Sequence, residues 1–204
     1  MEESRTRSEK SDATRLALIE SARRLFGSSG YAQVSLAQIV DASGLTKGAL
    51  YHHFPGGKRD LMEAVYEQVE TEFTEMVAAG VMPRLTEGDV DALSAMEQAI
   101  EVTLEASLDP ELQQIVLIDS PSVLGWTRWR EIADDHSLAV VKALLKAAEE
   151  QGAIRPVPTE PLAYLLMASL NEAILMVARA DDQARASAEA SEALRAIIEG
   201  LRAG

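Results

Sequence analysis

Hydrophobic positions recur at steps of three and four residues along the whole chain, which is the spacing of one face of an α-helix. Ile19, Ala22 and Leu25 follow this spacing, so residues 12–27 are predicted to form an amphipathic helix. A run of Gly and Ser at 27–30 is expected to end it, because Gly commonly terminates helices.

Two short helices with a tight turn between them are predicted next. Ser35 is placed as the N-cap of the first helix, and Gln38, three residues later, completes a capping box. Gly44 stands where a left-handed residue closes a helix. Thr46 has the residue type of a second N-cap, for a helix that ends near His53.

The rest of the chain is also predicted to be helical. A long helix begins near Leu61 and is expected to end at Gly80 and Pro83, since Pro removes a backbone donor and Gly has low helix propensity. Further helices are predicted at 89–107, 110–118, 124–151, 159–180 and 184–202. No stretch shows sustained strand alternation, so the predicted fold class is all-α.

Composition narrows the classes of function. The 204 residues include no Cys, which excludes disulfides and Cys-based metal sites and fits a reducing cytoplasm. The first fifteen residues lack the apolar stretch of a secretory signal, so a cytoplasmic location is expected. The apolar stretch 161–180 contains Asn171 and Glu172 at its centre, and is interpreted as a helix of a soluble protein that is buried nearly all round.

Charge is unevenly distributed over the chain. Residues 1–60 hold nine basic and seven acidic side chains, a net of +2. Residues 61–204 hold ten basic and twenty-six acidic side chains, a net of −16, which together give the formal charge of −14. A polyanion would therefore be approached by the first sixty residues and repelled by the others.

Two short helices joined by a glycine-containing turn are typical of a helix–turn–helix, whose second helix enters the major groove of DNA. Leu45, Leu50 and Phe54 are spaced to anchor that helix inward. On the other face, Lys47 can donate to guanine or phosphate, and Gly48 allows close backbone approach. The first amides of the helix at Ser35 and of the helix that follows Gly57 are also predicted to bind phosphates. The predicted DNA contacts are Ser35, Thr46, Lys47, Gly48, Tyr51, His52, His53 and Lys58.

Residues 15–61 resemble the DNA-binding head of TetR-type transcriptional regulators. The match includes Leu25-Phe26, Gly30-Tyr31, Val34-Ser35, Ala42, Gly44, Gly48, Leu50-Tyr51, His53-Phe54 and Lys58, in this order. One departure is the turn at 55–57, which has three residues where the commonest family form has two. This longer turn changes the lead into the next helix, and so the placement of Lys58, whereas it does not affect the second short helix.

The resemblance implies an all-helical homodimer, with a DNA-binding head at 1–55 and a ligand-binding and dimerisation body at 56–204. Each head would bind one half of a near-palindromic operator of double-stranded DNA. A small-molecule effector bound in the body would release the operator, and repression is the family's usual effect.

Five residues of the body are candidate effector contacts, each with a structural alternative. Trp126 and Trp129, the only tryptophans, either line an effector pocket or pack in the core. Asn171 interrupts an apolar helix and needs a polar partner, which is a ligand, a backbone group or a second subunit. Met76 and Met167 suit an adaptable, largely apolar pocket or fill gaps in the core.

The helix at 161–180 is apolar on more sides than one core face requires. The Ala-rich helix that follows it can pack closely against a copy of itself. These two helices and their copies in a second subunit are predicted to form a four-helix bundle at the dimer interface. The alternative is a monomer in which both faces are buried inside the body.

Two rival functions have different requirements. A structural DNA-binding protein without an effector would share the head but show little sequence preference. An enzyme could use the cluster Asp134, Asp135, His136 and Ser137, and a Ser–His–Asp set is not excluded by the sequence. However, no second His completes a metal site there, and no nucleophile elbow or phosphate loop occurs. We therefore expect no catalytic site, no metal and no cofactor.

Overall fold

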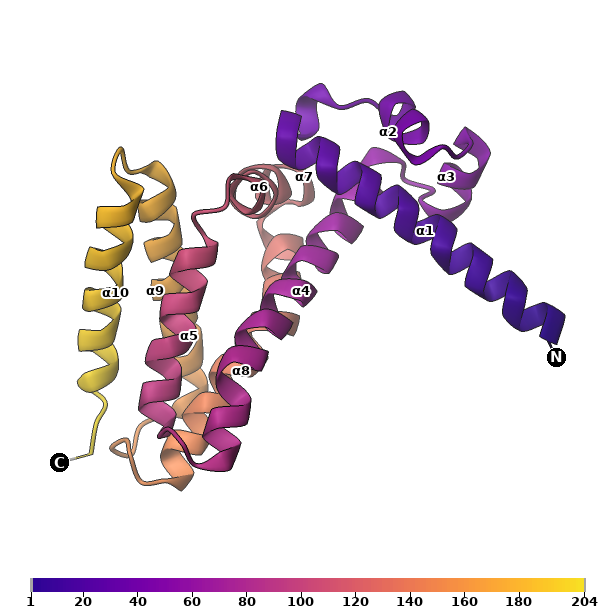
Figure 1. Cartoon of the computed structure of the whole chain (residues 1–204). Helices are drawn as coiled ribbons and strands as arrows, with labels where there is room; N and C mark the ends of the chain where they lie inside the picture. The colour runs from indigo at the N-terminus through magenta and orange to yellow at the C-terminus, as the bar shows by residue number, and fades with distance from the viewer. Residues whose placement is uncertain (1, 204) are drawn as a thin grey trace. The chain divides into compact units, whose positions relative to one another are not determined.

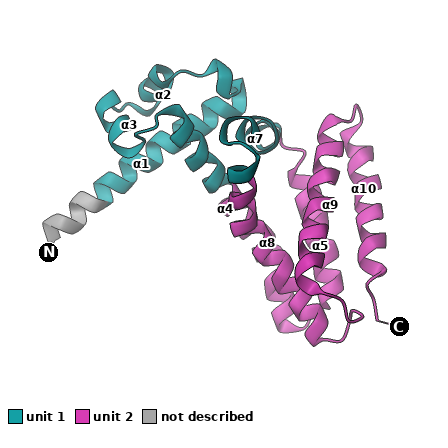
Figure 2. Ribbon diagram, turned by 180° about the vertical axis from the view of Figure 1, so that it is seen from behind, with its two compact units in different colours: residues 1–69, 110–129 teal, residues 70–109, 130–204 magenta. Residues whose placement is uncertain are grey.

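The computed structural model describes residues 2–203, with side chains described from residue 9 onward. These residues form helices and no strand, apart from an isolated β-bridge between Ile154 and Arg202 (Figure 1). The chain divides into two compact units, which are residues 1–69 with 110–129 and residues 70–109 with 130–204 (Figure 2). The all-α fold class is confirmed.

The first unit begins with three helices and a short 3-10 turn, namely α1 (Glu2–Ser29), η1 (Tyr31–Gln33), α2 (Leu36–Ser43) and α3 (Lys47–His53). Helix α1 packs against both α2 and α3. Phe26, Ile39 and Leu50 are fully buried in the core of this unit. Helix α1 starts well before the predicted residue 12, so the apolar spacing identified only the part of the helix that covers the core.

The local signals around α2 and α3 behave as predicted. Ser35 and Gln38 form both hydrogen bonds of the capping box. Gly44 closes α2 in the left-handed conformation, with φ of 68°. The Thr46 hydroxyl accepts a hydrogen bond from the amide of Ala49, at 3.2 Å, and so caps α3. Both predicted N-caps are thus confirmed.

A second stretch of chain completes the first unit. It consists of α6 (Pro110–Leu112), the π-helix η2 (Gln113–Asp119) and α7 (Ser120–Leu124). Ile115 is fully buried in the same core as Phe26 and Leu61. The sequence predicted a regular helix at 110–118, whereas the amide of Ser120 bonds the carbonyl of Ile115, five residues back. This wide turn is a π-helix, a form often found at functional sites.

Helix α4 (Lys58–Glu87) continues past the residues that were expected to end it. Pro83 lies inside the helix, and Gly80 is also helical. Pro83 removes only one backbone donor. Val81 is buried and Leu85 packs against the core of the second unit on either side of it. The prediction of an end at Gly80 and Pro83 was therefore wrong, because packing outweighed the local cost of both residues.

The second unit contains the end of α4 together with four further helical segments. These are α5 (Ala92–Ala106), α8 (Trp126–Glu150) from Arg130 onward, α9 (Thr159–Arg179) and α10 (Gln183–Glu199). Helix α10 packs against both α9 and α5. Leu93, Leu145, Val177 and Ile198 lie in their shared core. The predicted helices of this region are confirmed to within a few residues.

Helix α9 is not buried nearly all round, contrary to the prediction. Leu165 is 65% exposed and Met176 is 61% exposed. One side of α9 packs against α10 and α5, and its other side carries these apolar residues. By length and composition alone, α9 could cross a membrane.

Candidate nucleic-acid interface

The inward face of α3 anchors the helix in the first unit. Leu50 and Phe54 are buried, and Leu45 packs against the same core with part of its surface exposed. These three residues were predicted to point inward, and the structure places them there. Their burial fixes which side of α3 faces away from the core.

That outward side carries Lys47, Gly48, Tyr51 and His52, here called the reading face. All four are exposed, and Tyr51 is exposed over 52% of its surface. A Cβ at Gly48 would meet only the Thr46 hydroxyl, at 3.8 Å, so packing does not require Gly there. Gly48 instead leaves the backbone of α3 open to close approach. The reading face contains no acidic residue.

The two N-caps lie on the exposed surface beside this face. Gln38 accepts hydrogen bonds from both the amide and the hydroxyl of Ser35, each at 2.8 Å. Ser35 and Thr46 are both exposed. The first amides of a helix attract anions because of the helix dipole. The starts of α2 and α3 therefore offer positively polarised backbone groups close to the reading face.

The two histidines at the end of α3 differ in their surroundings. His52 is exposed, whereas His53 is half-buried. Their rings meet edge to face, with centroids 5.1 Å apart, and His53 also lies 6.4 Å from the Phe54 ring. The guanidinium of Arg15, on α1, lies 5.5 Å from the same Phe54 ring. Arg15 thus adds a cation at this end of α3, which the sequence pattern alone did not predict.

Lys58 points into its own unit. Its Nζ donates to the carbonyls of Tyr31 and Val34, each at 2.8 Å, and lies 4.0 Å from the centre of the Tyr31 ring. Burial lowers the pKa of Lys58, and the nearby charge of Asp119 opposes that change. Two of its three N–H donors are used inside the protein, which leaves one for an external phosphate.

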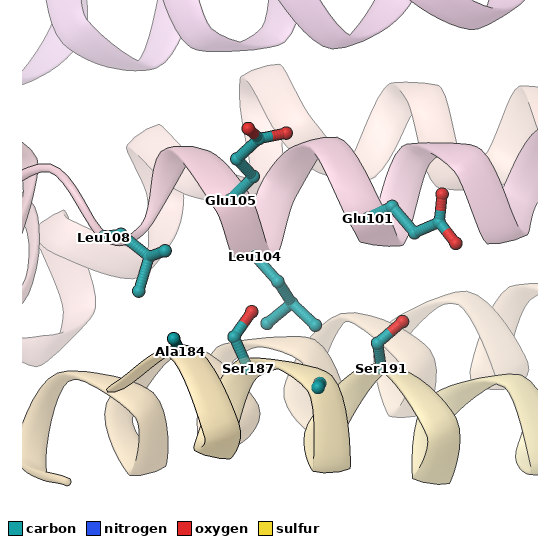
Figure 3. A pocket seen from close by; sticks show the side chains of 8 residues that line it. Glu101, Leu104, Glu105, Leu108, Ala184, Ser187 and Ser191 are labelled. Carbon is teal, nitrogen blue, oxygen red and sulfur yellow. The ribbon is translucent and has the colours of Figure 1, made fainter. Parts of the chain in front are cut away.

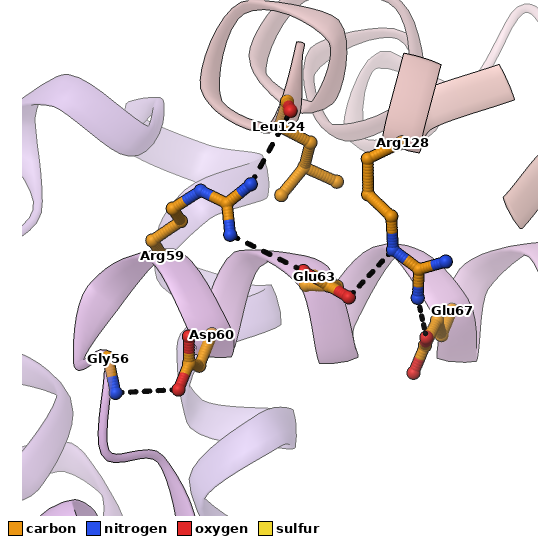
Figure 4. A network of polar contacts seen from close by, with 7 residues as sticks. All are labelled: Gly56, Arg59, Asp60, Glu63, Glu67, Leu124 and Arg128. Carbon is orange, nitrogen blue, oxygen red and sulfur yellow. Dashed lines mark hydrogen bonds and ion pairs between the residues drawn. The ribbon is translucent and has the colours of Figure 1, made fainter. Parts of the chain in front are cut away.

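The turn before α4 contains a hydrogen bond to a carboxylate of the helix itself. The amide of Gly56 donates to Oδ2 of Asp60 at 2.6 Å, so a carboxylate already occupies the start of α4 (Figure 4). An anion of the protein therefore stands where the sequence suggested a seat for a DNA phosphate.

An ion-pair network joins the start of α4 to the start of α8. Arg128 donates to Glu63 at 2.8 Å and to Glu67 at 3.0 Å (Figure 4). Arg59 lies 3.7 Å from Glu63 and bonds the carbonyl of Leu124. This network helps to hold α7 and the first residues of α8 in the first unit.

Two further long-range contacts were missed by sequence reasoning. Arg23 of α1 donates to Glu111 at 2.7 Å, and the amide of Tyr31 donates to Asp119 at 2.7 Å. Each pair is separated by 88 residues in the sequence. No local motif signals such pairs, and only the fold brings them together.

The candidate effector contacts fall into both units. Trp126 is 67% exposed and stacks on the buried Trp129, with ring centroids 4.9 Å apart. The indole of Trp129 donates to the carbonyl of Val116 at 3.0 Å, so this residue has a structural role in the first unit. In the second unit, Met167 is buried, Asn171 is half-buried and Met76 is exposed.

The second unit also has an open groove between α5 and α10, with a volume of about 290 Å³ (Figure 3). Leu104 and Leu108 line it, together with the side chains of Glu101, Glu105, Ser187 and Ser191. None of the five candidate effector contacts lines this groove. Among the described residues, no cluster of His, Cys, Asp or Glu is arranged to hold a metal ion.

Comparison with known proteins matches both parts of the chain. Residues 18–65 match the family described as bacterial regulatory proteins of the tetR family, and residues 93–201 match the Tetracyclin repressor-like, C-terminal domain. The second match alone covers more than half of the chain. The Transposon Tn10 TetC protein of Escherichia coli is 29% identical over 168 residues, or 81% of each chain.

Two other relatives agree with this assignment. A TetR-family transcriptional regulator from Pectobacterium atrosepticum has a solved structure with a TM-score of 0.80 and 31% identity, covering 96% of this chain and 97% of that one. The transcriptional repressor AcnR of Corynebacterium glutamicum is 28% identical over 57% of this chain and 62% of its own. These proteins are regulators and not enzymes. The chain belongs to the TetR family of bacterial transcriptional regulators.

Proposed function

We propose that this regulator is a cytoplasmic repressor that binds a near-palindromic operator as a homodimer and is released by a small, largely apolar effector. The observation that carries the proposal is the geometry of α3. One side is buried through Leu50 and Phe54, and the other presents an acid-free reading face. A helix held in this way fits the major groove of B-DNA.

On DNA, each group of the interface has a distinct task. Lys47 donates to guanine or to a phosphate, and Tyr51 donates its hydroxyl to a phosphate or packs on a thymine methyl. Gly48 lets the backbone of α3 approach. Ser35, Thr46, His52 and His53 contact phosphates near both ends of the helix pair. Lys58 adds its remaining donor. Residues 1–55 are the proposed DNA-binding head, and residues 56–204 the proposed ligand-binding and dimerisation body.

A single α3 helix reads only a few base pairs, so specific binding needs two copies. The exposed apolar face of α9, with Leu165 and Met176, together with the exposed Ile197 of α10, supports a four-helix subunit interface. This use of α9 accounts for its apolar surface without a membrane. Two symmetric heads would then bind half-sites about 34–36 Å apart.

The effector acts through differential affinity. It must bind the DNA-incompetent form more tightly than the DNA-bound form, by about 1–3 kcal/mol or more. In the second unit, Met76, Met167 and Asn171 are proposed contacts, whose thioether and amide groups suit a largely apolar ligand with one hydrogen-bonding group. In the first unit, Trp126 and Trp129 are proposed separately, as aromatic contacts. Repression is supported by the relative AcnR, whose name describes a repressor.

The test is a titration of the purified chain against duplex DNA at near-physiological salt. The probes are a duplex from the upstream region of its own gene, a duplex selected from a random library, and an unrelated control. A preference of about 1000-fold or more for one of the first two is expected of a specific regulator. Equal, weak binding to all three would instead indicate a structural DNA-binding protein.

A further inference from the structure

A short turn sets where α2 begins. It comprises residues 31–34, here called the η1 turn, and lies between the end of α1 and the N-cap Ser35. Val34 is buried, and Tyr31 packs on the Phe26 ring with centroids 5.3 Å apart. Because α3 follows α2 after a tight turn, a displacement of the η1 turn moves both helices, and the reading face moves with them.

The η1 turn is held by two charged groups that are distant from it in the sequence. Oδ2 of Asp119 accepts the amide hydrogen of Tyr31 at 2.7 Å. Lys58 donates to the carbonyls of Tyr31 and Val34. The first amide and the carbonyls at both ends of the turn are therefore bound to charged groups, which form stronger hydrogen bonds than neutral partners.

Asp119 is itself fixed by the π-helix η2, whose last residue it is. Ile115 of η2 is fully buried in the core of the first unit. The hydroxyl of Ser120 bonds the carbonyl of Ile115 at 2.6 Å, and Trp129 bonds the carbonyl of Val116. The ion pair of Arg23 and Glu111 secures the chain just before η2. The carboxylate is thus attached to a rigid element and not to a loop.

We infer that Asp119 is a positioning residue for DNA recognition, which fixes the η1 turn through the amide of Tyr31 and so sets the reading face. This inference rests on the proposed DNA-binding function. It extends the DNA-recognition apparatus to a segment outside residues 1–55. Asp119 acts through Tyr31, and no contact between Asp119 and DNA is required.

The sign of the effect separates this role from simple electrostatics. Asp119 carries negative charge in a unit that binds a polyanion. If charge alone mattered, its removal would strengthen DNA binding. If it positions the η1 turn, its removal weakens specific binding despite the more favourable charge. The two interpretations therefore predict opposite changes in affinity.

The experiment uses the full chain and three variants, Asp119→Ala, Asp119→Asn and Glu20→Ala. Affinity for the selected duplex is measured over a range of salt concentrations. Asp119→Ala is expected to weaken binding by about tenfold, because loss of the hydrogen bond should leave the η1 turn correctly placed in only about a tenth of the free molecules. Asp119→Asn is expected to bind at least as well as the wild type, because its amide oxygen still accepts from Tyr31. Glu20→Ala removes an exposed acid of α1 and should not weaken binding.

Two readouts make the outcome decisive. The salt slope should be unchanged in Asp119→Ala, because no phosphate contact is removed. Hydrogen exchange should show faster exchange of the Tyr31 amide in Asp119→Ala, with the core amides of α1 and α4 still protected. Equal or tighter binding by Asp119→Ala, or equal weakening by Asp119→Asn, overturns the inference. Global loss of protection in Asp119→Ala also overturns it, since the residue would then be needed for folding.

The failure of the proposed function would look different. In that case the wild-type chain itself would show no preference for any duplex, and the inference would fall with it. If the wild type binds specifically and only the variants disagree with expectation, the proposed function stands and the role of Asp119 is rejected.

Discussion

Tyr51 is the residue at which recognition and stability are most clearly separated. Its side chain is half-exposed at the centre of the reading face, whereas the adjacent Leu50 is buried. Tyr51→Ala is expected to weaken specific DNA binding by about tenfold, from the loss of one hydrogen bond and its contacts. Its free energy of unfolding should stay within about 0.5 kcal/mol of the wild type. Leu50→Ala is the control, and should cost about 2–5 kcal/mol in urea unfolding.

Lys47 tests which part of DNA the reading face touches. Lys47→Ala is expected to weaken binding at all salt concentrations. Loss of a phosphate contact would lower the salt slope by about 1 and leave sequence preference intact. Loss of a guanine contact would relax preference at one position of the operator. If affinity, slope and preference all matched those of the wild type, Lys47 would not belong to the interface.

Residues with a local signal were predicted well, and residues without one were missed. Ser35, Gly44 and Thr46 cap or close helices through groups within four residues of them, so sequence alone sufficed. Lys58 stays a predicted DNA contact, but no local signal indicated that two of its donors bind carbonyls more than twenty residues earlier. Asp119 contacts a turn 88 residues away. Side-chain partners at such distances depend on the fold, which local patterns do not contain.

Among the helices, burial of apolar side chains accounts both for those that were predicted and for the wrong end of α4. The spacing of apolar residues identified the long helices, because each of them buries one face. It did not identify where α4 ends, since Val81 and Leu85 pack against the core around Pro83. Nor did it identify η2 as a π-helix, whose Ile115 is buried in the core of the first unit.

Two glycines outside any tight contact give a test of helix boundaries. A Cβ at Gly44 or at Gly80 would meet nothing within 4 Å, so only the backbone conformation distinguishes them. Gly44 closes α2 with φ of 68°, and Gly44→Ala should therefore destabilise the protein by about 1–2 kcal/mol. Gly80 lies inside α4, and Gly80→Ala should stabilise it by about 0.5–1 kcal/mol.

Urea unfolding of the two Gly variants measures these changes against the wild type. The comparison also checks the corrected end of α4. If α4 ended near residue 80, as the sequence indicated, Gly80→Ala would give no gain in stability. Opposite signs for the two substitutions are required by the observed helix bounds.

Over the whole molecule, charge and apolar surface have different roles. Charge governs binding to DNA, and apolar surface governs the proposed pairing of two subunits. The net charge is +2 over the first sixty residues and −16 over the others, by residue count. DNA binding should therefore weaken steeply as salt rises, because each phosphate contact made by the basic head releases counterions. The acidic remainder keeps the rest of the chain off DNA. The proposed dimer should then depend on apolar contacts, which salt does not screen.

The exposed apolar face of α9 is the place to test assembly. Leu165→Glu puts a charge where Leu165 is 65% exposed, so it should leave the fold intact but prevent close packing of a second copy. We expect monomers by sedimentation equilibrium, and loss of specific DNA binding because a lone head reads only one half-site. Ile118→Glu, a similar change at an exposed residue of η2, is the matched control and should remain dimeric. A Leu165→Glu protein that still sediments as a dimer would place the subunit interface elsewhere, and the apolar surface of α9 would then need another partner.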